Sequence, residues 1–242
     1  MCESSELSTD QPSHIYTDYV LGNRSVRTAI TRRVRDWVAG WAYTLANSPR
    51  VPPTLRASAA SYGLCNDAFV DNGNWPYQMY VREGVRLVGD WVATQVNTVT
   101  GACVPGAVAL GAWSIDIHLM RRFAGSRGGQ PSTENEGEVG FQAFPGAGTV
   151  YELPLAAVLP KASQVSNLAA PVTPSASHVA FGSIRVEPVF MALGTAAGAA
   201  CVQALAEGGS ALADVDTAAL QARLAGVDQC YHWADGKCAD SC

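Results

Sequence analysis

The uncharged stretch from Pro188 to Ala206 constrains the fold more than any other feature, because such a long apolar segment must be buried in protein or in lipid. It consists mostly of Ala, Gly and other small residues, with little Leu, Ile or Phe to favour membrane insertion. Proline is tolerated in the first turn of a helix. The stretch therefore predicts a helix over 188–206 that is buried in the protein, and no membrane span.

The chain is large enough to surround such a helix with a hydrophobic core. It has 242 residues, 48% hydrophobic and 15% charged, which suits one large domain or two small ones. Its formal net charge of −5 argues against a nucleic-acid partner held by the overall electrostatic field.

Hydrophobic periodicity and turn residues predict a mixed α and β chain, α+β or mixed α/β, without clean βαβ alternation. Helices are predicted over 24–46, 78–95 and 216–225, the last with Asp216 as its cap and Gly226 as its stop. Short strands are predicted around 108–117, 150–153, 167–173 and 179–185. The glycine-rich stretch 124–149 indicates a loop or a pair of hairpins.

Arginines are concentrated at the start of the first predicted helix, at Arg24, Arg27, Arg32, Arg33 and Arg35. A basic helix face can bind a phosphate, but it more often simply faces solvent. Both interpretations stay open.

The seven cysteines include no C-x-x-C pair, so no metal site is predicted. Cys201 lies in an Ala-rich stretch and is expected to be a buried thiol. The tail holds Cys230, Cys238 and Cys242 with His232, which allows a metal clip, a disulfide-closed tail or an unstructured terminus. The polar, acidic N-terminus lacks the features of a secretory signal, so free cysteines and a cytoplasmic or organellar stromal location are expected.

Residues 175–198 (SASHVAFGSIRVEPVFMALGTAAG) are the segment most suited to binding a ligand. Gly182 and Ser183 allow a ligand to approach the backbone closely, and Pro188 begins a helix rich in small residues. A helix start carries free N–H groups and partial positive charge, which suits an electron-rich heterocycle or an anion. A helix of small residues packed tightly against a sheet is the alternative.

This segment resembles the C-terminal flavin-binding signature of FAD-dependent oxidoreductases similar to the heterodisulfide reductase A subunit. Further motifs follow in the family order, at 75–83 (WPYQMYVRE), 114–121 (SIDIHLMR), 134–137 (ENEG), 151–154 (YELP) and 167–168 (NL). The resemblance spans about residues 20–207. It implies FAD as cofactor, an oxidoreductase activity on an unidentified small molecule, and the C-terminal, flavin-facing cap and substrate part of a two-dinucleotide-type flavoprotein fold.

The resemblance also implies roles for individual residues. Contacts to the flavin are expected from Gly182, Ser183, Arg185, Glu187, Pro188, Met191 and Gly194. Candidates for the catalytic, substrate-side groups are Asp116, His118 and His178, because flavin oxidations usually need a proton acceptor.

Two departures from the family pattern stand out. Leu155 and Ala156 replace an aromatic and a basic residue that normally follow Pro154. No G-x-G-x-x-G turn for the ADP half occurs anywhere. We therefore expect a fragment, or one subunit whose N-terminal Rossmann unit lies on a missing dinucleotide-binding domain or chain, inactive and weak in FAD binding by itself. The expected organisation is a disordered N-terminus over 1–19, the flavoprotein region over 20–207, and a helix with a cysteine-containing tail over 208–242.

Two other functions compete with this interpretation. One is a non-catalytic remnant or interaction module, in which the 175–198 segment serves packing only. The other is a hydrolase built from Ser114, Asp116 and His118, which alternate along one predicted strand but lack a G-x-S-x-G elbow.

Overall fold

A computed structural model describes residues 15–239, except for residues 82, 119–120, 138 and 140–148. The chain divides into two compact units, Met1–Gly84 and Val85–Cys242, which we describe separately. The division falls inside the predicted region 20–207, and the predicted boundaries at 19–20 and 207–208 stay predictions.

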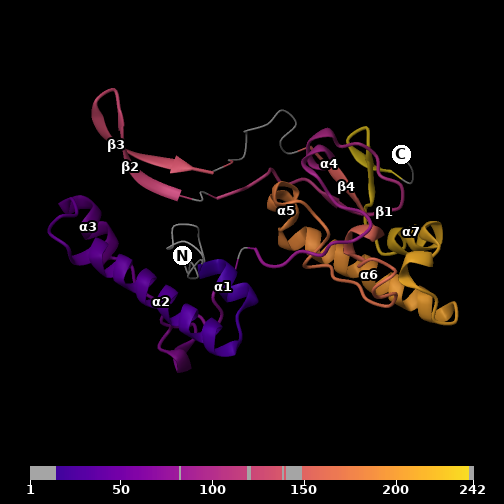
Figure 1. Cartoon of the computed structure of the whole chain (residues 1–242), viewed down its shortest axis with the longest axis horizontal. Coiled ribbons are helices and arrows are strands. Elements are labelled where there is room, and N and C mark those ends of the chain that lie inside the picture. Colours follow the sequence, from indigo (N-terminus) through magenta and orange to yellow (C-terminus); the bar gives the residue numbers. More distant parts are fainter. Residues whose placement is uncertain (1–14, 82, 119–120, 138, 140–148, 240–242) are drawn as a thin grey trace. The chain divides into compact units, whose positions relative to one another are not determined.

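Helices dominate the first unit (Figure 1). They are α1 (Ile15–Leu21), α2 (Arg24–Asn47), α3 (Pro53–Ala60) and the short 3-10 helix η1 (Val70–Asn72). The side chain of Asn23 caps α2 by accepting a hydrogen bond of 3.1 Å from the Val26 backbone N–H. The helix predicted over 24–46 is confirmed. Helix α1 shows that the expected disorder is wrong for residues 15–19, while residues 1–14 lie outside the described residues.

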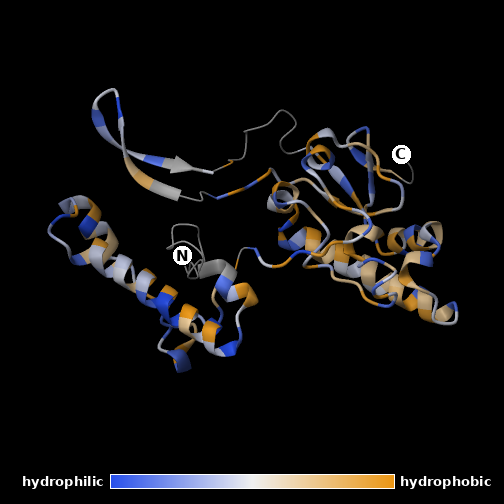
Figure 2. Ribbon diagram, viewed as in Figure 1, coloured by the Kyte–Doolittle hydropathy of each residue, from blue (hydrophilic) through white to orange (hydrophobic). Residues whose placement is uncertain are grey.

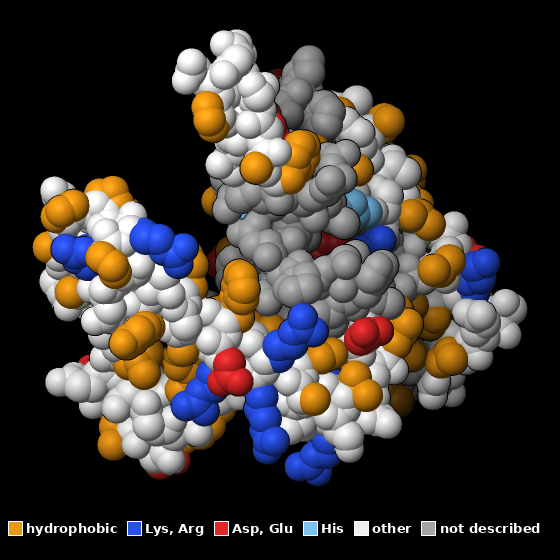
Figure 3. Space-filling view, turned by 60° about the vertical axis from the view of Figure 1, so that its left-hand side comes forward, with side chains coloured by type: hydrophobic (Ala, Val, Ile, Leu, Met, Phe, Trp, Pro, Cys, Tyr) orange, Lys and Arg blue, Asp and Glu red, His pale blue; other side chains and the backbone are white. Residues whose placement is uncertain are grey.

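The core of the first unit is small. Ile30 and Val34 of α2 are buried with Met79, and Tyr19, Val38 and Val81 pack around them. Farther along α2, Trp37 and Trp41 are 51% and 61% exposed. The apolar residues that recur at helical spacing in α2 are therefore buried only in the first half of the helix. Hydrophobic side chains at the surface appear in orange in Figure 3.

The second unit holds the remaining elements. Its helices are α4 (Gln95–Thr100), α5 (His178–Ile184), α6 (Glu187–Ala206) and α7 (Thr217–Ala225), with the 3-10 helices η2 (Leu155–Val158) and η3 (Leu212–Asp214). Its strands are β1 (Ala107–Gly111), β2 (Arg121–Arg127), β3 (Gln130–Glu136), β4 (Tyr151–Pro154), β5 (His232–Ala234) and β6 (Lys237–Ala239). All three described sheets are two-stranded and antiparallel, β1–β4, β2–β3 and β5–β6, which fits the α+β class.

The main core lies where α6 and α7 pack against the β1–β4 pair. Gly111 pairs with Tyr151 in this sheet, and a Cβ on Gly111 would lie 2.4 Å from the Tyr151 ring. Tyr151, Leu153 and Leu193 have no exposed surface. The large aromatic side chain therefore occupies the space that a glycine leaves open.

Helix α6 is the predicted buried helix, with Pro188 in its first turn (Figure 2). One face, including Val189, Leu193 and Ala200, belongs to the core of the second unit. By length and composition alone α6 could also cross a membrane, with a mean hydropathy of 1.7. Its packing against β1 and α7 supports its role as a core helix of the unit.

The tail is closed by a disulfide bond between Cys230 and Cys238, which joins the two ends of the β5–β6 hairpin. Within the tail, His232 Nδ1 lies 2.9 Å from Glu152 Oε1, and both side chains are nearly buried. The disulfide-closed tail is therefore the alternative that the structure shows for this segment. Cys65 and Cys103 each take part in a disulfide bond as well. The expectation of free cysteines is wrong for Cys65 and Cys103, whereas Cys201 is free, although it is only partly buried. Cys242 lies outside the described residues.

The helix predicted over 78–95 does not form; the described part of this segment is irregular until α4 begins. Its backbone bonds elsewhere: the Leu87 and Ala93 N–H groups donate to the carbonyls of Thr173 and Ser175, at 3.0 and 2.9 Å. Gly89 lies so close to the Leu159 carbonyl that a Cβ would be only 2.6 Å from its oxygen. Tertiary contacts therefore override the apolar spacing that predicted a helix.

Two predicted strands are also corrected. Residues 179–185 form most of helix α5, because the Ser177 hydroxyl caps its start by accepting from the Ala180 N–H at 3.2 Å. Residues 167–173 contain no strand, and their turn is closed by the Thr173 N–H donating to the Ala170 carbonyl. In the glycine-rich stretch, β2 and β3 form one hairpin around Gly128 and Gly129, which both have positive φ.

Replacing Gly89 with Ala tests the close packing of the extended segment. The added Cβ would meet a backbone oxygen of Leu159 at 2.6 Å, so we expect Gly89→Ala to lower the free energy of unfolding by about 1–3 kcal/mol. Gly84→Ala is the matched control, because its Cβ would meet nothing within 4 Å. Denaturant titration followed by tryptophan fluorescence measures both, and equal stability of the two variants would contradict the packing described here.

Candidate functional site

Five of the predicted site residues lie together where the segment 113–118 crosses α5. The Asp116 N–H donates to the Gly182 carbonyl at 3.3 Å. A Cβ on Gly182 would lie 2.9 Å from the Asp116 carbonyl oxygen, which is tighter than ordinary contact. Gly182 therefore allows a close backbone approach, as predicted, but within the described residues the approaching group is the protein's own chain.

Ser183 anchors this crossing from inside the core. Its hydroxyl donates a short hydrogen bond to the Trp113 carbonyl and lies 2.8 Å from the Tyr151 hydroxyl. Because the single Ser183 proton is used on Trp113, the Tyr151 hydroxyl is the donor to Ser183. Burial raises the pKa of Tyr151 to about 12, since a phenolate would lie in the apolar core.

Asp116 joins Arg185 and His118 at the site. Arg185 Nη2 donates to the Asp116 backbone carbonyl at 2.7 Å and lies 3.5 Å from carboxylate Oδ2. The same Oδ2 lies 3.2 Å from His118 Nε2. The side chain of Arg185 is 7% exposed, that of Asp116 26% and that of His118 40%, so this row of side chains runs from the interior to the surface.

This arrangement can orient an imidazole for proton transfer. A neutral His118 that donates from Nε2 to Asp116 leaves Nδ1 as a proton acceptor. The buried guanidinium of Arg185 holds Asp116 in place through its backbone carbonyl and through carboxylate Oδ2. No hydrogen bond joins Ser114 to His118 among the described residues, so a hydrolytic triad is not assembled there.

The remaining predicted residues lie nearby in sequence but on exposed surface. His178 is the first residue of α5 and is exposed, and Glu187 and Pro188 lie exposed in the first turn of α6. Met191 is 69% exposed, and a Cβ on Gly194 would meet nothing within 4 Å. Of these, Pro188, Met191 and Gly194 form a strip of small and apolar groups at the start of α6, exposed at Pro188 and Met191 and partly exposed at Gly194.

Sequence reasoning assigned no role to Tyr151 or Trp113, although both hold Ser183. The only signal was their position next to or within motifs already recognised, 151–154 and 114–121. Arg86 was missed in the same way: its Nε donates to the Ala176 carbonyl at 3.0 Å, and its guanidinium lies over the Phe181 ring. These contacts join residues far apart in sequence, which spacing alone does not reveal.

Two hollows are defined by the described residues, and neither includes Gly182, Ser183 or Arg185. One, of about 220 Å³, is bordered by Asp90, Leu155 and Ala156 in the second unit. It lies where the sequence departs from the family pattern, at the small residues after Pro154. The other lies in the first unit, between α1 and α2.

Comparison with known families matches residues 4–224 to the FAD dependent oxidoreductase family. The chain belongs to this family of flavoproteins. The match includes the motifs at 75–83, 114–121 and 175–198 and every predicted site residue. No curated protein and no solved structure matches the chain.

Family membership implies FAD binding, and the start of α6 fits one part of that cofactor. Its N-cap residue, Val186, makes no side-chain cap hydrogen bond. On the strip beside it, Gly194 has no side chain, and the space above its Cα is open. Pro188 and Met191 on this strip offer apolar surface to a planar ring. Gly182 and Ser183 fit a direct contact less well, because Asp116 and Trp113 already occupy their surroundings.

The buried phenol of Tyr151 predicts a specific pH dependence of stability. A pKa raised above 10 in the folded state gives stability that is present below pH 10 and lost as pH rises toward about 12. We expect the difference in unfolding free energy between the wild type and Tyr151→Phe to change by up to about 1.4 kcal/mol per pH unit in this window. A difference in unfolding free energy between the wild type and Tyr151→Phe that stays constant from pH 10 to about 12 would contradict this.

Proposed function

We propose that this flavoprotein oxidoreductase chain contributes the isoalloxazine-side contacts and the substrate side of the active site. The observation that carries the proposal is the family match over residues 4–224, which includes both the α6 start and the Asp116–His118 pair. When bound, FAD supplies a two-electron acceptor for oxidation of a small molecule.

The first turn of α6 supports binding at the electron-rich end of the flavin ring. A helix of 20 residues concentrates partial positive charge at its N-terminus, and here no side chain caps that end. Met191 and Gly194 lie one and two turns into the helix on its accessible side. We propose that these two residues lie against the ring while the helix start stabilises negative charge on it.

The Asp116–His118 pair supports a role in proton transfer. Asp116 holds the Nε2 side of the imidazole, so His118 Nδ1 accepts a proton as a substrate C–H or O–H bond is oxidised. Arg185 acts as a positioning residue, because it fixes Asp116 rather than reaching the reacting atoms. His178, at the exposed start of α5, is the second candidate for this side of the site.

The ADP half of FAD requires a partner in this proposal. The sequence contains no G-x-G-x-x-G turn, and the described sheets are small antiparallel pairs rather than a parallel βαβ unit. We propose that a dinucleotide-binding domain or chain completes the site, as in a fragment or a separate subunit, and that this chain alone holds FAD weakly.

A non-catalytic remnant is the second candidate, and one observation favours it. Gly182 and Ser183, which the family resemblance assigns to the flavin, are buried against Asp116 and Trp113. In that case the segment serves packing, and no flavin binds with or without a partner domain.

Flavin titration of the full chain separates these proposals. With excess inorganic pyrophosphate present to occupy any separate phosphate site, FMN and FAD should bind with affinities equal within about twofold if only the isoalloxazine side is present, since the ADP half adds no contacts there. Met191→Glu should weaken both by about tenfold, because it places a negative charge beside the electron-rich ring. Leu205→Glu is the matched control, as Leu205 is 76% exposed near the other end of α6.

Fluorescence quenching of the flavin measures these affinities. FAD binding far more tightly than FMN would contradict the missing ADP site. Absence of flavin binding, both alone and with a co-expressed dinucleotide-binding domain, would contradict the oxidoreductase role and support the remnant.

A further inference from the structure

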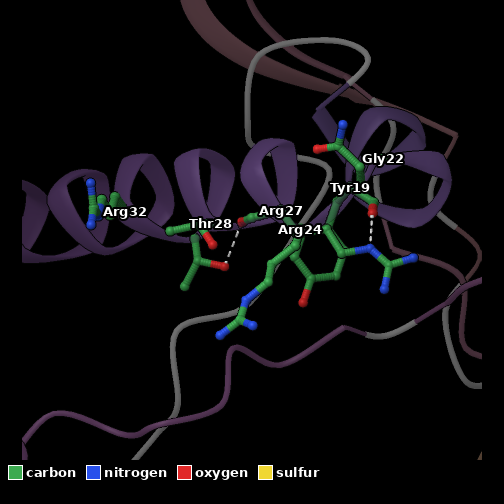
Figure 4. A pocket seen from close by; sticks show the side chains of 8 residues that line it. Tyr19, Gly22, Arg24, Arg27, Thr28 and Arg32 are labelled. Atoms are coloured by element: carbon green, nitrogen blue, oxygen red, sulfur yellow. Dashed lines mark hydrogen bonds between the residues drawn. The ribbon is translucent and has the colours of Figure 1, made fainter.

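A basic hollow of about 540 Å³ lies in the first unit, and none of its lining residues is among those assigned to the flavin (Figure 4). Its lining includes Tyr19 and Gly22 from the α1 end and Arg24, Arg27, Thr28 and Arg32 from α2. The α2 residues recur at three- and four-residue spacing, so they share one face of the helix. The neighbouring face of α2 buries Ile30 and Val34 in the core of the unit, against which Tyr19 also packs. The hollow is therefore built on a rigid, packed helix.

Arg27 is fixed in position within this hollow. Its Nε donates to the Tyr19 carbonyl at 3.0 Å and its Nη2 to the Val20 carbonyl at 2.9 Å. The guanidinium also lies 5.8 Å from the centre of the Tyr19 ring. A guanidinium has five N–H donors, so these bonds leave donors available in a preorganised group. Little side-chain entropy is lost when such a group binds an anion.

The positive charges around Arg27 lower the stability of helix α2. Residues 24–35 carry five arginines and no acidic residue, in a chain whose net charge is −5. The first turn of α2 has no acidic residue to complement the positive end of the helix dipole. Arg24 and Arg32 make no hydrogen bond or ion pair with any described residue. Like charges three residues apart, as at Arg24 and Arg27, also repel. A bound anion would offset both effects.

We propose that this hollow binds the phosphate group of a soluble small molecule. Guanidinium groups match phosphate geometry through paired charge-assisted hydrogen bonds, and Thr28 adds a hydroxyl donor on the same helix face. The hollow distinguishes this surface from an ordinary solvated basic face, because Arg24, Arg27 and Arg32 all line one concavity. The proposal does not depend on flavin binding at α6.

Calorimetric titration of the full chain with inorganic pyrophosphate tests the proposal. The wild type should bind pyrophosphate and ADP, and adenosine, which lacks phosphate, should not bind. The double variant Arg24→Gln/Arg32→Gln should weaken pyrophosphate binding at least about tenfold, since it removes two charge-assisted partners. Arg27 is left intact because it also holds α1. Circular dichroism verifies that the variant remains folded.

Arg33→Gln is the matched control. Arg33 is exposed on the same helix and carries the same charge, but it does not line the hollow. Its substitution should change the affinity less than about twofold. No pyrophosphate binding by the wild type, equal losses in Arg33→Gln and the double variant, or equal binding of adenosine would each overturn the proposal. Met191→Glu should leave pyrophosphate binding unchanged, so failure of the flavin proposal is distinguishable from failure of this one.

Discussion

The close contact between Gly182 and the Asp116 backbone is the constraint on which the candidate site depends. It brings α5 against a segment more than sixty residues earlier in the chain, and only a residue without a Cβ allows that distance. Arg185 then reaches the Asp116 carbonyl and Oδ2 from the end of α5, and His118 lies at the same Oδ2. The backbone contact at Gly182 therefore determines where Arg185 and Asp116 lie. Asp116 in turn positions the His118 imidazole, which is available for chemistry at the surface.

The core of the second unit keeps this crossing rigid. Tyr151 fills the space beside Gly111 and holds Ser183. The buried Glu152 binds the tail through His232 and the Trp233 N–H, and it accepts a further hydrogen bond from the Val104 N–H before β1. The Cys230–Cys238 disulfide closes that tail against the same sheet. Cys103, Glu152 and His232 bring possible metal-ligand atoms within 4.8 Å of one another, but the Cys103 sulfur is in a disulfide and is no thiolate ligand. The cluster thus serves the scaffold.

Sequence patterns predicted the elements that local chemistry decides and failed where distant contacts decide. The helices at 24–46, 188–206 and 216–225 followed from periodicity, Pro188 and the Asp216 cap. The extended segment before α4 was mistaken for a helix, because its bonds to 173–177 are invisible in local spacing. The structure brings Asp116, His118, Gly182 and Arg185 together, and the family motifs did not reveal that Gly182 contacts the chain itself. The disulfides of Cys65 and Cys103 remove the free-cysteine argument for a cytoplasmic or stromal location.

The central claim is that the exposed start of α6, beside the Asp116–His118 pair, faces the flavin ring. Photolabelling of the full chain with an azido-substituted FAD, followed by peptide mapping, tests this directly. The account predicts covalent label within residues 187–194, suppressed by excess unlabelled FAD. Label confined to other segments, or label in 187–194 that unlabelled FAD does not suppress, would contradict it.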